Sequence, residues 1–420
     1  MPRVLVFGAG AVGSVYTYLL HRAGCSVTVI CRSNYAAVSS HGFRISSAKF
    51  GSDVHVQPSV VRSAAETAEK SSSDDSAWDY ILVSSKALPG SQPTQASLIA
   101  PAVGPQTAIV LVQNGIGIED EYAAAFPNNP LVSGVVYLPV TQTAPGEIRM
   151  GEIELLQLGT YPTQAPEAHK ARAVEFMELV TKGGGTCRVF DDIQPRRWSK
   201  LLVNASWNPI CALVRTSDVQ FMASSPGATV FVWEAMLEVV KIAQALGYAE
   251  ITEKDALYQL ERAKVRTEAN AVEPSMLSDV RNNRQMEVEA ILGNTVRMAR
   301  DKGVKVVKLE ALYVLIKALD EVHDSAVLLT AETGGQVLGK MVVPEQLLKD
   351  IGGQELGKTV VPEQLLDGNE GQELGKAVVP EELLGEHERQ ELGYIVVPEQ
   401  AGHEVLQAGH DVGIIVVGVH

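Results

Sequence analysis

The chain has 420 residues, 46% of them hydrophobic and 20% charged, a composition typical of a soluble globular protein with two or three domains. Its formal net charge is −15, and the stretch from 335 to 420 contributes fifteen acidic residues against five basic ones. This acidic balance argues against nucleic acid or an anionic membrane as a partner, and no apolar run reaches the roughly 18 residues of a membrane span.

The N-terminal residues form a βαβ unit. The apolar run Arg3–Phe7 predicts a buried strand, residues 11–23 carry the apolar face of a helix that Gly24 ends, and residues 26–31 predict a second strand. Because the first strand begins at the third residue, it leaves no room for a signal peptide, and we expect a cytoplasmic protein. The four cysteines, none in CxxC spacing, fit a reducing compartment and predict neither a metal site nor a redox pair.

A glycine-rich turn separates the first strand from the helix. It has the pattern G-x-G-x-x-G and consists of Gly8, Ala9, Gly10, Ala11, Val12 and Gly13. Gly8 permits a tight turn, Gly10 lets the backbone approach a pyrophosphate, and Gly13 lets the helix pack closely against the strand. Since the pattern stands between a strand and a helix, it predicts a dinucleotide site, with the phosphates at the positive end of the helix.

The residues after the second strand indicate which dinucleotide binds. Enzymes that use NAD place an acidic residue there to bind the ribose 2′-hydroxyl, whereas no acidic residue occurs between Gly13 and Gly51. The strand instead ends in Cys31 and is followed by Arg32, whose forked donors suit a 2′-phosphate. We therefore expect NADP(H) as the cofactor.

The rest of the folded part divides into a strand-rich and a helical portion. Buried strands are predicted over 79–84, 108–112, 131–138 and 151–159, and helices over 193–213, 228–246, 252–269, 276–302 and 307–319. The fold class is therefore α/β, with a Rossmann-type parallel sheet domain over residues 1–189 that binds NADP and an all-α substrate domain over residues 190–325.

The C-terminal tail, residues 335–420, is repetitive. It contains four copies of an 18-residue repeat, with Pro344, Pro362, Pro380 and Pro398 at equivalent positions. Each copy is too short and too poor in aromatic residues to bury a face alone. We expect an acidic tail that is disordered or weakly helical, and a stacked array or a partner-binding surface is the alternative.

Two clusters of polar residues lie in the helical portion. Lys200, Asn204 and Asn208 are spaced i, i+4 and i+8, which stacks them on one face of a helix within an apolar stretch. Spacing alone leaves two interpretations open, a solvated polar stripe or a lysine proton donor with amides in line. The second cluster consists of Glu273–Asp279 followed by Arg284–Glu289, at the start of a predicted long helix, and by itself indicates only a capped helix with a charged face.

Four segments together resemble the signature stretches of the ketopantoate reductase family. They are VLVFGAGAVGSVYTYLLHRAG at 4–24, LVQNGIG at 111–117, RRWSKLLVNASWNPICAL at 196–213 and SMLSDVRNNRQMEVEAILG at 275–293. They occur in the family's order, and the resemblance spans about residues 3–320 without the tail. It implies an NADP-dependent oxidoreductase that reduces a 2-keto acid, 2-dehydropantoate to pantoate, in pantothenate biosynthesis.

The resemblance also implies roles for individual residues at the substrate. Lys200 matches the general acid toward the reduced carbonyl, and Glu287 matches an acidic residue close to the nicotinamide and the substrate hydroxyl. Asn204 and Asn208 match amides that hold the substrate, and Ser275 matches a serine that binds its carboxylate.

On the cofactor side, Asn114 matches an asparagine near the nicotinamide ribose, and Lys86 matches a lysine that follows a strand of the sheet. The assigned chemistry is physically consistent, because a lysine partly desolvated in a closed cleft has a lowered pKa and stabilises a developing alkoxide.

Two positions depart from the family's pattern. Met286 stands where the family has a threonine before the glutamate, and Leu292 stands where it has an asparagine before a glycine. We expect both changes to remove polar groups near the substrate, and Trp207 could reshape the pocket. The same chemistry on another 2-keto compound is therefore an alternative.

A third interpretation belongs to another class, an NADP-binding sensor or interaction protein that has kept the fold and uses the tail as its partner surface. Lys200, Asn208 and Glu287 argue against it. Family members are monomers or dimers that meet through the helical domain, so the resemblance allows a homodimer. Otherwise the expected partner is a small 2-keto substrate, with no metal.

Overall fold

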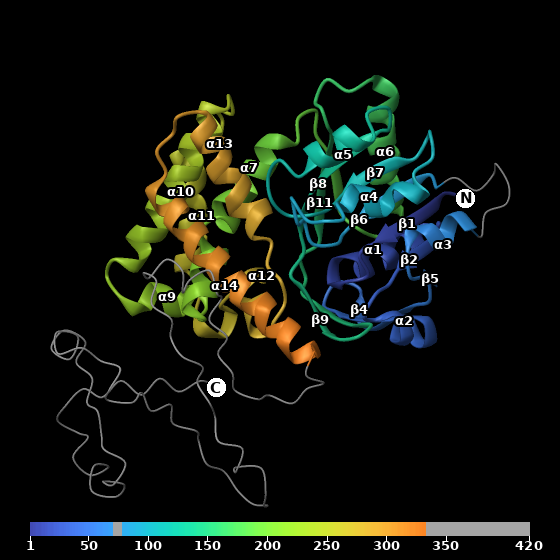
Figure 1. Cartoon of the computed structure of the whole chain (residues 1–420), viewed down its shortest axis with the longest axis horizontal. Coiled ribbons are helices and arrows are strands. Elements are labelled where there is room, and N and C mark those ends of the chain that lie inside the picture. The colour runs from blue at the N-terminus through green and yellow to red at the C-terminus, as the bar shows by residue number, and fades with distance from the viewer. Residues whose placement is uncertain (70–77, 333–420) are drawn as a thin grey trace, which may run out of the picture. The chain divides into compact units, whose positions relative to one another are not determined.

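The computed structural model describes residues 1–69 and 78–332, which lie within one compact unit (Figure 1). The predictions made for the repeat tail, 335–420, lie outside the described residues. In the described part of the chain, no helix is long and apolar enough to cross a membrane.

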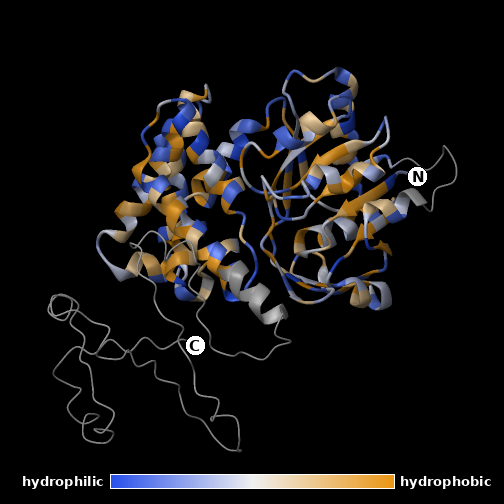
Figure 2. Cartoon of the chain, viewed as in Figure 1, coloured by the Kyte–Doolittle hydropathy of each residue, from blue (hydrophilic) through white to orange (hydrophobic). Residues whose placement is uncertain are grey.

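An eight-stranded, mostly parallel sheet forms the centre of the N-terminal domain, in the order β12-β11-β8-β7-β6-β1-β2-β5. Its strands are β1 (Arg3–Phe7), β2 (Ser26–Ile30), β5 (Ser59–Val61), β6 (Tyr80–Val83), β7 (Ala108–Leu111), β8 (Leu131–Tyr137), β11 (Leu155–Thr160) and β12 (Cys187–Val189). Neighbouring strands from β8 to β5 are parallel, whereas β11 is antiparallel to β8. Hydrophobic residues concentrate in the central strands (Figure 2), as expected for a sheet buried on both faces. The predicted Rossmann-type sheet is confirmed.

Helices cover both faces of this sheet. One face packs against α1 (Ala11–Arg22) and α6 (Glu167–Lys182). The other packs against α3 (Ala64–Glu69), α4 (Gln95–Ile99) and α5 (Glu119–Ala125). The N-terminus of α1 therefore lies at the carboxyl end of β1, where a Rossmann sheet binds its ligand.

A second sheet of four short strands, which the sequence analysis did not identify, lies beside α1. Its order is β4-β3-β10-β9, and its strands are β3 (Phe43–Ser47), β4 (Gly51–Val56), β9 (Val140–Ala144) and β10 (Glu147–Met150). Along β3 and β10 buried and exposed residues alternate, because only one side of the sheet faces the core. Such short polar segments lack the continuous apolar runs that revealed the main sheet. The short helix α2 (Tyr35–His41) precedes β3.

The C-terminal half is helical, as predicted (Figure 1). Its elements are α7 (Gln194–Asn204), α8 (Trp207–Val214), α9 (Asp218–Ser224), α10 (Ala228–Ala245), α11 (Glu253–Lys264), α12 (Ser275–Arg281), the π-helix η4 (Glu289–Gly293), α13 (Asn294–Asp301) and α14 (Val307–Glu332). A single hydrophobic core joins them, with Trp198 of α7 and Met236 of α10 both almost fully buried.

The prediction of one helix over 193–213 was wrong, because the chain breaks between α7 and α8. Pro209 has no N–H to donate to the carbonyl of Ala205, as a continuous helix would require. Ser206 Oγ instead donates to the carbonyl of Leu202 at 2.6 Å, a local bond that competes with the helical pattern. The break separates residues on α7 from those on α8.

The prediction of one helix over 276–302 was also wrong. After α12 the backbone turns at Asn283, which adopts a left-handed φ of 48°, a conformation that asparagine tolerates better than most residues. The N–H of Arg284 then donates to the carbonyl of Asp279 at 2.9 Å. Glu287 consequently lies in a non-helical segment just before the π-helix.

Candidate active site

The glycine-rich turn between β1 and α1 has the geometry of a phosphate-binding loop. Gly8 has a φ of +114°, and a Cβ there would lie 2.2 Å from the backbone N of Ser85. A Cβ on Gly13 would lie 2.0 Å from the carbonyl oxygen of Gly8, so both positions require glycine. A Cβ on Gly10 would meet nothing within 4 Å, which leaves the backbone open to a ligand. The site fits a dinucleotide, because the first turn of α1 also contains no acidic residue.

The segment after β2 fits an anionic group beside this loop. Arg32 is exposed, and its guanidinium lies 5.8 Å from the centre of the Phe7 ring. Asn34 Nδ2 donates to the carbonyl of Ala9 at 2.7 Å, which fastens the segment to the glycine-rich turn. Asn34 was not singled out from the sequence, because one asparagine in a loop carries no distinguishing pattern.

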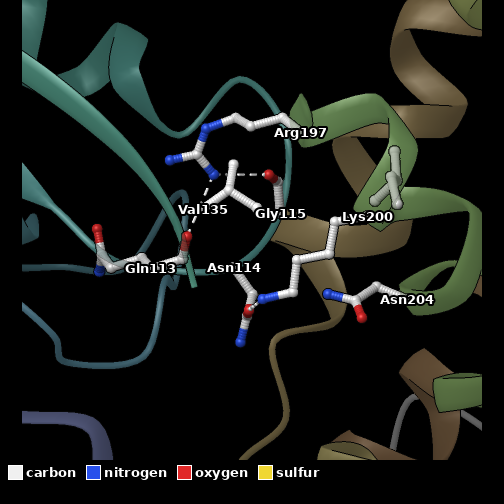
Figure 3. A pocket seen from close by; sticks show the side chains of 8 residues that line it. Gln113, Asn114, Gly115, Val135, Arg197, Lys200 and Asn204 are labelled. Carbon is white, nitrogen blue, oxygen red and sulfur yellow. Dashed lines mark hydrogen bonds between the residues drawn. The ribbon is translucent and has the colours of Figure 1, made fainter. Parts of the chain in front are cut away.

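Lys200 lies on the part of α7 that faces the sheet (Figure 3). Its Nζ donates to Asn114 Oδ1 at 2.8 Å and to the carbonyl of Val136 at 2.5 Å. Burial lowers the pKa of Lys200 to about 8, with the nearby Glu287 carboxylate acting in the opposite direction and the Arg197 guanidinium adding to the decrease. An amine in this state is a proton donor suited to neutral pH.

Asn114 connects Lys200 to Glu287. Its Nδ2 donates to Glu287 Oε2 at 2.9 Å, while the backbone N–H of Ala87 donates to Glu287 Oε1 at 2.9 Å. Glu287 is 7% exposed, so these bonds hold a nearly buried carboxylate in place. The structure thus brings together three residues of the predicted site from three distant segments.

A small pocket lies beside this chain of hydrogen bonds (Figure 3). It is lined by Gln113, Asn114, Gly115, Val135, Arg197, Lys200, Leu201 and Asn204. Asn204, one turn after Lys200, therefore faces the same space as the lysine.

Asn208 and Ser275 form a separate pair, because the helix break places Asn208 on α8. Ser275 Oγ donates to Asn208 Oδ1 at 3.4 Å, and Asn208 is 5% exposed. The predicted single polar face of Lys200, Asn204 and Asn208 is therefore wrong as a continuous helical stripe. Its first two members share a pocket, and the third contacts the start of α12.

Lys86, which follows β6, reaches the helical domain. Its Nζ lies 2.8 Å from Asp279 Oδ2 and also bonds the carbonyl of Gln285. Arg284 Nε lies 3.1 Å from the other oxygen of Asp279. Burial raises the pKa of Asp279, although Lys86 and Arg284 oppose this effect. Lys86 thus links the two domains next to the segment that contains Glu287.

The three residues expected to alter the substrate pocket lie in the hydrophobic core instead. Met286, Leu292 and Trp207 are 1%, 0% and 3% exposed, and all belong to the core of the helical domain. Trp207 packs edge-on against Phe221, with ring centroids 6.3 Å apart. None of the three lines the pocket that contains Lys200, and the expectation that they alter the substrate end of the site stays a prediction.

Sequence reasoning missed a buried ion pair beneath the pocket. Arg197 and Glu119 are 4% and 0% exposed, and Arg197 Nε lies 2.7 Å from Glu119 Oε1. Neither spacing nor composition distinguishes Arg197 from its exposed neighbour Arg196. Among the described residues, no group of three or more histidine, cysteine or acidic side chains could hold a metal ion.

The chain is similar to known proteins over most of its described length. The family model for ketopantoate reductase PanE/ApbA matches residues 4–163, and the model for the C-terminal part of the same family matches residues 192–320. A 2-dehydropantoate 2-reductase from Pyrobaculum aerophilum is 31% identical over 322 residues, which cover 76% of this chain and 99% of the relative.

Two further similarities extend this result. An uncharacterized protein of Saccharomyces cerevisiae is 32% identical over 338 residues, which cover 75% of this chain and 93% of that protein. The crystal structure of 2-dehydropantoate 2-reductase from Methylococcus capsulatus is 36% identical, with a TM-score of 0.65, and the match covers 76% of this chain and 97% of that one.

Proposed function

Since this chain belongs to the ketopantoate reductase family, we propose that it reduces 2-dehydropantoate to pantoate with NADPH and that Lys200 is the general acid. Family membership makes the protein an oxidoreductase that acts on a CH–OH group with a nicotinamide cofactor and a small keto acid. The observation that carries the finer proposal is Lys200 itself, which is held by Asn114 on the wall of a pocket and has a pKa of about 8.

The reaction needs one hydride on the carbonyl carbon and one proton on its oxygen. The nicotinamide cofactor supplies the hydride when it is bound. Lys200 Nζ donates the proton to the oxygen as the alkoxide develops, and its positive charge stabilises that oxygen. A proton donor placed in this way contributes about 10²–10⁴-fold to the rate.

The neighbouring residues keep the lysine and the substrate in position. Asn114 accepts a hydrogen bond from Lys200 and donates one to Glu287, so it fixes the distance between cation and carboxylate. We assign Glu287 to the substrate hydroxyl, Asn204 and Asn208 to the body of the substrate, and Ser275 to its carboxylate. Asn204 supports this assignment best, because it lines the pocket of Lys200.

NADPH is proposed over NADH because of the residues after β2. The stretch between Gly13 and Gly51 contains no carboxylate to bind a ribose 2′-hydroxyl, and the exposed Arg32 suits a 2′-phosphate. The pyrophosphate is assigned to the turn from Gly8 to Gly13, and we assign Lys86 and Asn114 to the cofactor side of the site.

The test is to follow NADPH oxidation by the full chain with 2-dehydropantoate as substrate. Turnover should be strong with NADPH, weak with NADH and nearly abolished in Lys200→Ala. The matched control is Lys170→Ala, which removes a partly exposed lysine of α6 whose side chain forms an ion pair with Glu167, away from the pocket. NADPH binding without turnover would reject the pantoate assignment and favour another 2-keto acid.

A further inference from the structure

Arg197 is buried one helical turn before Lys200, and its side chain donates hydrogen bonds to the loop that contains Asn114 (Figure 3). Its Nη1 donates to the carbonyl of Gln113 at 3.2 Å and to the carbonyl of Gly115 at 3.1 Å. These two carbonyls flank Asn114 on both sides. The guanidinium therefore determines where the amide of Asn114 is presented to Lys200.

The same guanidinium also holds the second support of Lys200. Arg197 Nη2 donates to the carbonyl of Gly134 at 3.2 Å, and Nε donates to Ser133 Oγ at 2.7 Å. Both acceptors belong to β8, the strand whose Val136 carbonyl accepts a hydrogen bond from Lys200. One side chain thus fixes both acceptors of the lysine ammonium.

Glu119, at the start of α5, forms an ion pair with Arg197. Its Oε1 accepts hydrogen bonds from Ser133 Oγ at 2.7 Å and Gln194 Nε2 at 2.9 Å, in addition to its ion pair with Arg197. Burial by itself would raise the pKa of Glu119, but the Arg197 charge and these hydrogen bonds outweigh burial and lower it. The carboxylate is therefore charged and compensates the arginine.

A buried ion pair of this kind contributes little net stability, because desolvation of both charges offsets their attraction. We propose that Arg197 is a positioning residue for the reduction, which places Asn114 and Val136 around Lys200 and sets a positive charge beside it, and that Glu119 orients and compensates Arg197. This inference rests on the role of Lys200 proposed above.

The inference makes opposite predictions for two changes of charge. The charged or titratable groups that face Lys200 are Arg197 on the same helix, Glu287 before the π-helix, and Tyr137 on β8, whose ring centre lies 5.6 Å from Nζ. Glu119→Gln leaves the charge of Arg197 uncompensated and should lower the pKa of Lys200. Glu119→Gln combined with Arg197→Met removes that charge and should raise the pKa above its wild-type value.

The experiment measures the pKa of Lys200 in the full chain in two ways. The first is the pH dependence of kcat/KM for NADPH-dependent reduction. The second is competitive acetylation of Lys200 by acetic anhydride at a series of pH values, quantified by mass spectrometry, which reports the unprotonated amine without any turnover. Ser133→Ala is the matched control, because it removes two hydrogen bonds from the same cluster without changing its charge, and it should shift the pKa of Lys200 less than either charge variant.

We expect shifts of opposite sign for the single and the double variant, together with a loss of roughly 100-fold in kcat for the double variant from misplacement of Lys200. Shifts of the same sign, or no shift with a lowered melting temperature, would show that the ion pair is only structural. If Glu119→Gln does not fold, because it leaves the buried Arg197 charge unpaired, the double variant against Ser133→Ala still decides. If 2-dehydropantoate is not reduced, acetylation still tests Arg197, so the two proposals fail separately.

Discussion

The proton on Lys200 is subject to opposed effects. Withdrawal from water and the Arg197 guanidinium favour the neutral amine, whereas the Glu287 carboxylate favours the charged one. Their balance gives a pKa of about 8, well below the value of about 10.4 for an unperturbed lysine. At neutral pH the residue is therefore mostly protonated but gives up its proton readily.

The pH profile of the reduction should reflect this balance. Because the proposed mechanism requires the protonated amine of Lys200, kcat/KM should be level below pH 8 and fall as the pH rises through the pKa of about 8. Lys200→Arg is the matched control, since arginine keeps the positive charge but does not give up its proton, so this variant should lose most of its turnover at every pH. A limb near pH 10 in the wild type would contradict a desolvated lysine.

Glu287→Gln should shift the decrease of kcat/KM at high pH toward lower pH. The substitution keeps the shape of the side chain but removes the negative charge that favours protonated Lys200, so the limb should move to lower pH. The variant should still fold, because the amide oxygen can accept the hydrogen bond from the Ala87 N–H. An unchanged limb, measured from kcat/KM against pH, would show that Glu287 does not influence the lysine.

At the scale of elements, the site depends on a loop that fits tightly against the π-helix. The N–H of Ile116 donates to the carbonyl of Ala290 at 3.0 Å, and Asn294 Nδ2 donates to the carbonyl of Ile116 at 2.7 Å. Gly115 has a φ of +101°, and a Cβ there would lie 2.5 Å from the oxygen of Ala290. The loop that carries Asn114 therefore tolerates no side chain at the next position.

Gly115→Ala should consequently destabilise the protein by more than about 2 kcal/mol, from backbone strain together with overpacking. Gly247→Ala provides the control, because Gly247 has a similar φ of +100° but a Cβ there would meet nothing within 4 Å. It should show only the strain, about 1 kcal/mol. The measurement is the free energy of unfolding in urea. An equal decrease for both variants would mean that the contact with Ala290 adds no destabilisation to the backbone strain.

The elements that periodicity predicted well are those with continuous apolar runs. The strands β1, β6 and β7 are buried at nearly every position, and each consists of a continuous run of mostly apolar residues, which predicts a buried strand. The helix breaks were missed although Pro209 and Asn283 were visible, because periodicity continues across both interruptions. The second sheet was missed because a strand with one exposed face resembles a polar loop.

At the scale of the whole molecule, the candidate site residues and the family matches all lie before residue 321, within the described part of the chain. A chain that ends at residue 338 should therefore keep its kcat/KM with NADPH and 2-dehydropantoate. The full chain, assayed in parallel, is the reference. A clear loss of turnover in the shortened chain would assign the repeat tail a part in catalysis.

The site could be predicted only where residues recur in a known pattern. Lys200, Asn114 and Glu287 lie in family motifs, and the structure brings them together. Arg197 and Glu119 were not predicted, because their pairing depends on how α7 packs against β8, which no spacing encodes. For the same reason the contact of Lys86 with Asp279 could not be foreseen, since it depends on the fit between two domains.

The contacts of Glu287 also have a consequence for how the protein acquires activity. Its two partners, Ala87 and Asn114, precede it by 200 and 173 positions in the chain. The entropic cost of closing such loops must be overcome before the contacts stabilise the fold, so we expect these contacts to form late in folding. During refolding, helical content and the glycine-rich turn should return first, while the shifted pKa of Lys200 returns only when the last long loop closes. The rate at which turnover returns during refolding should therefore report the rate of the last folding step.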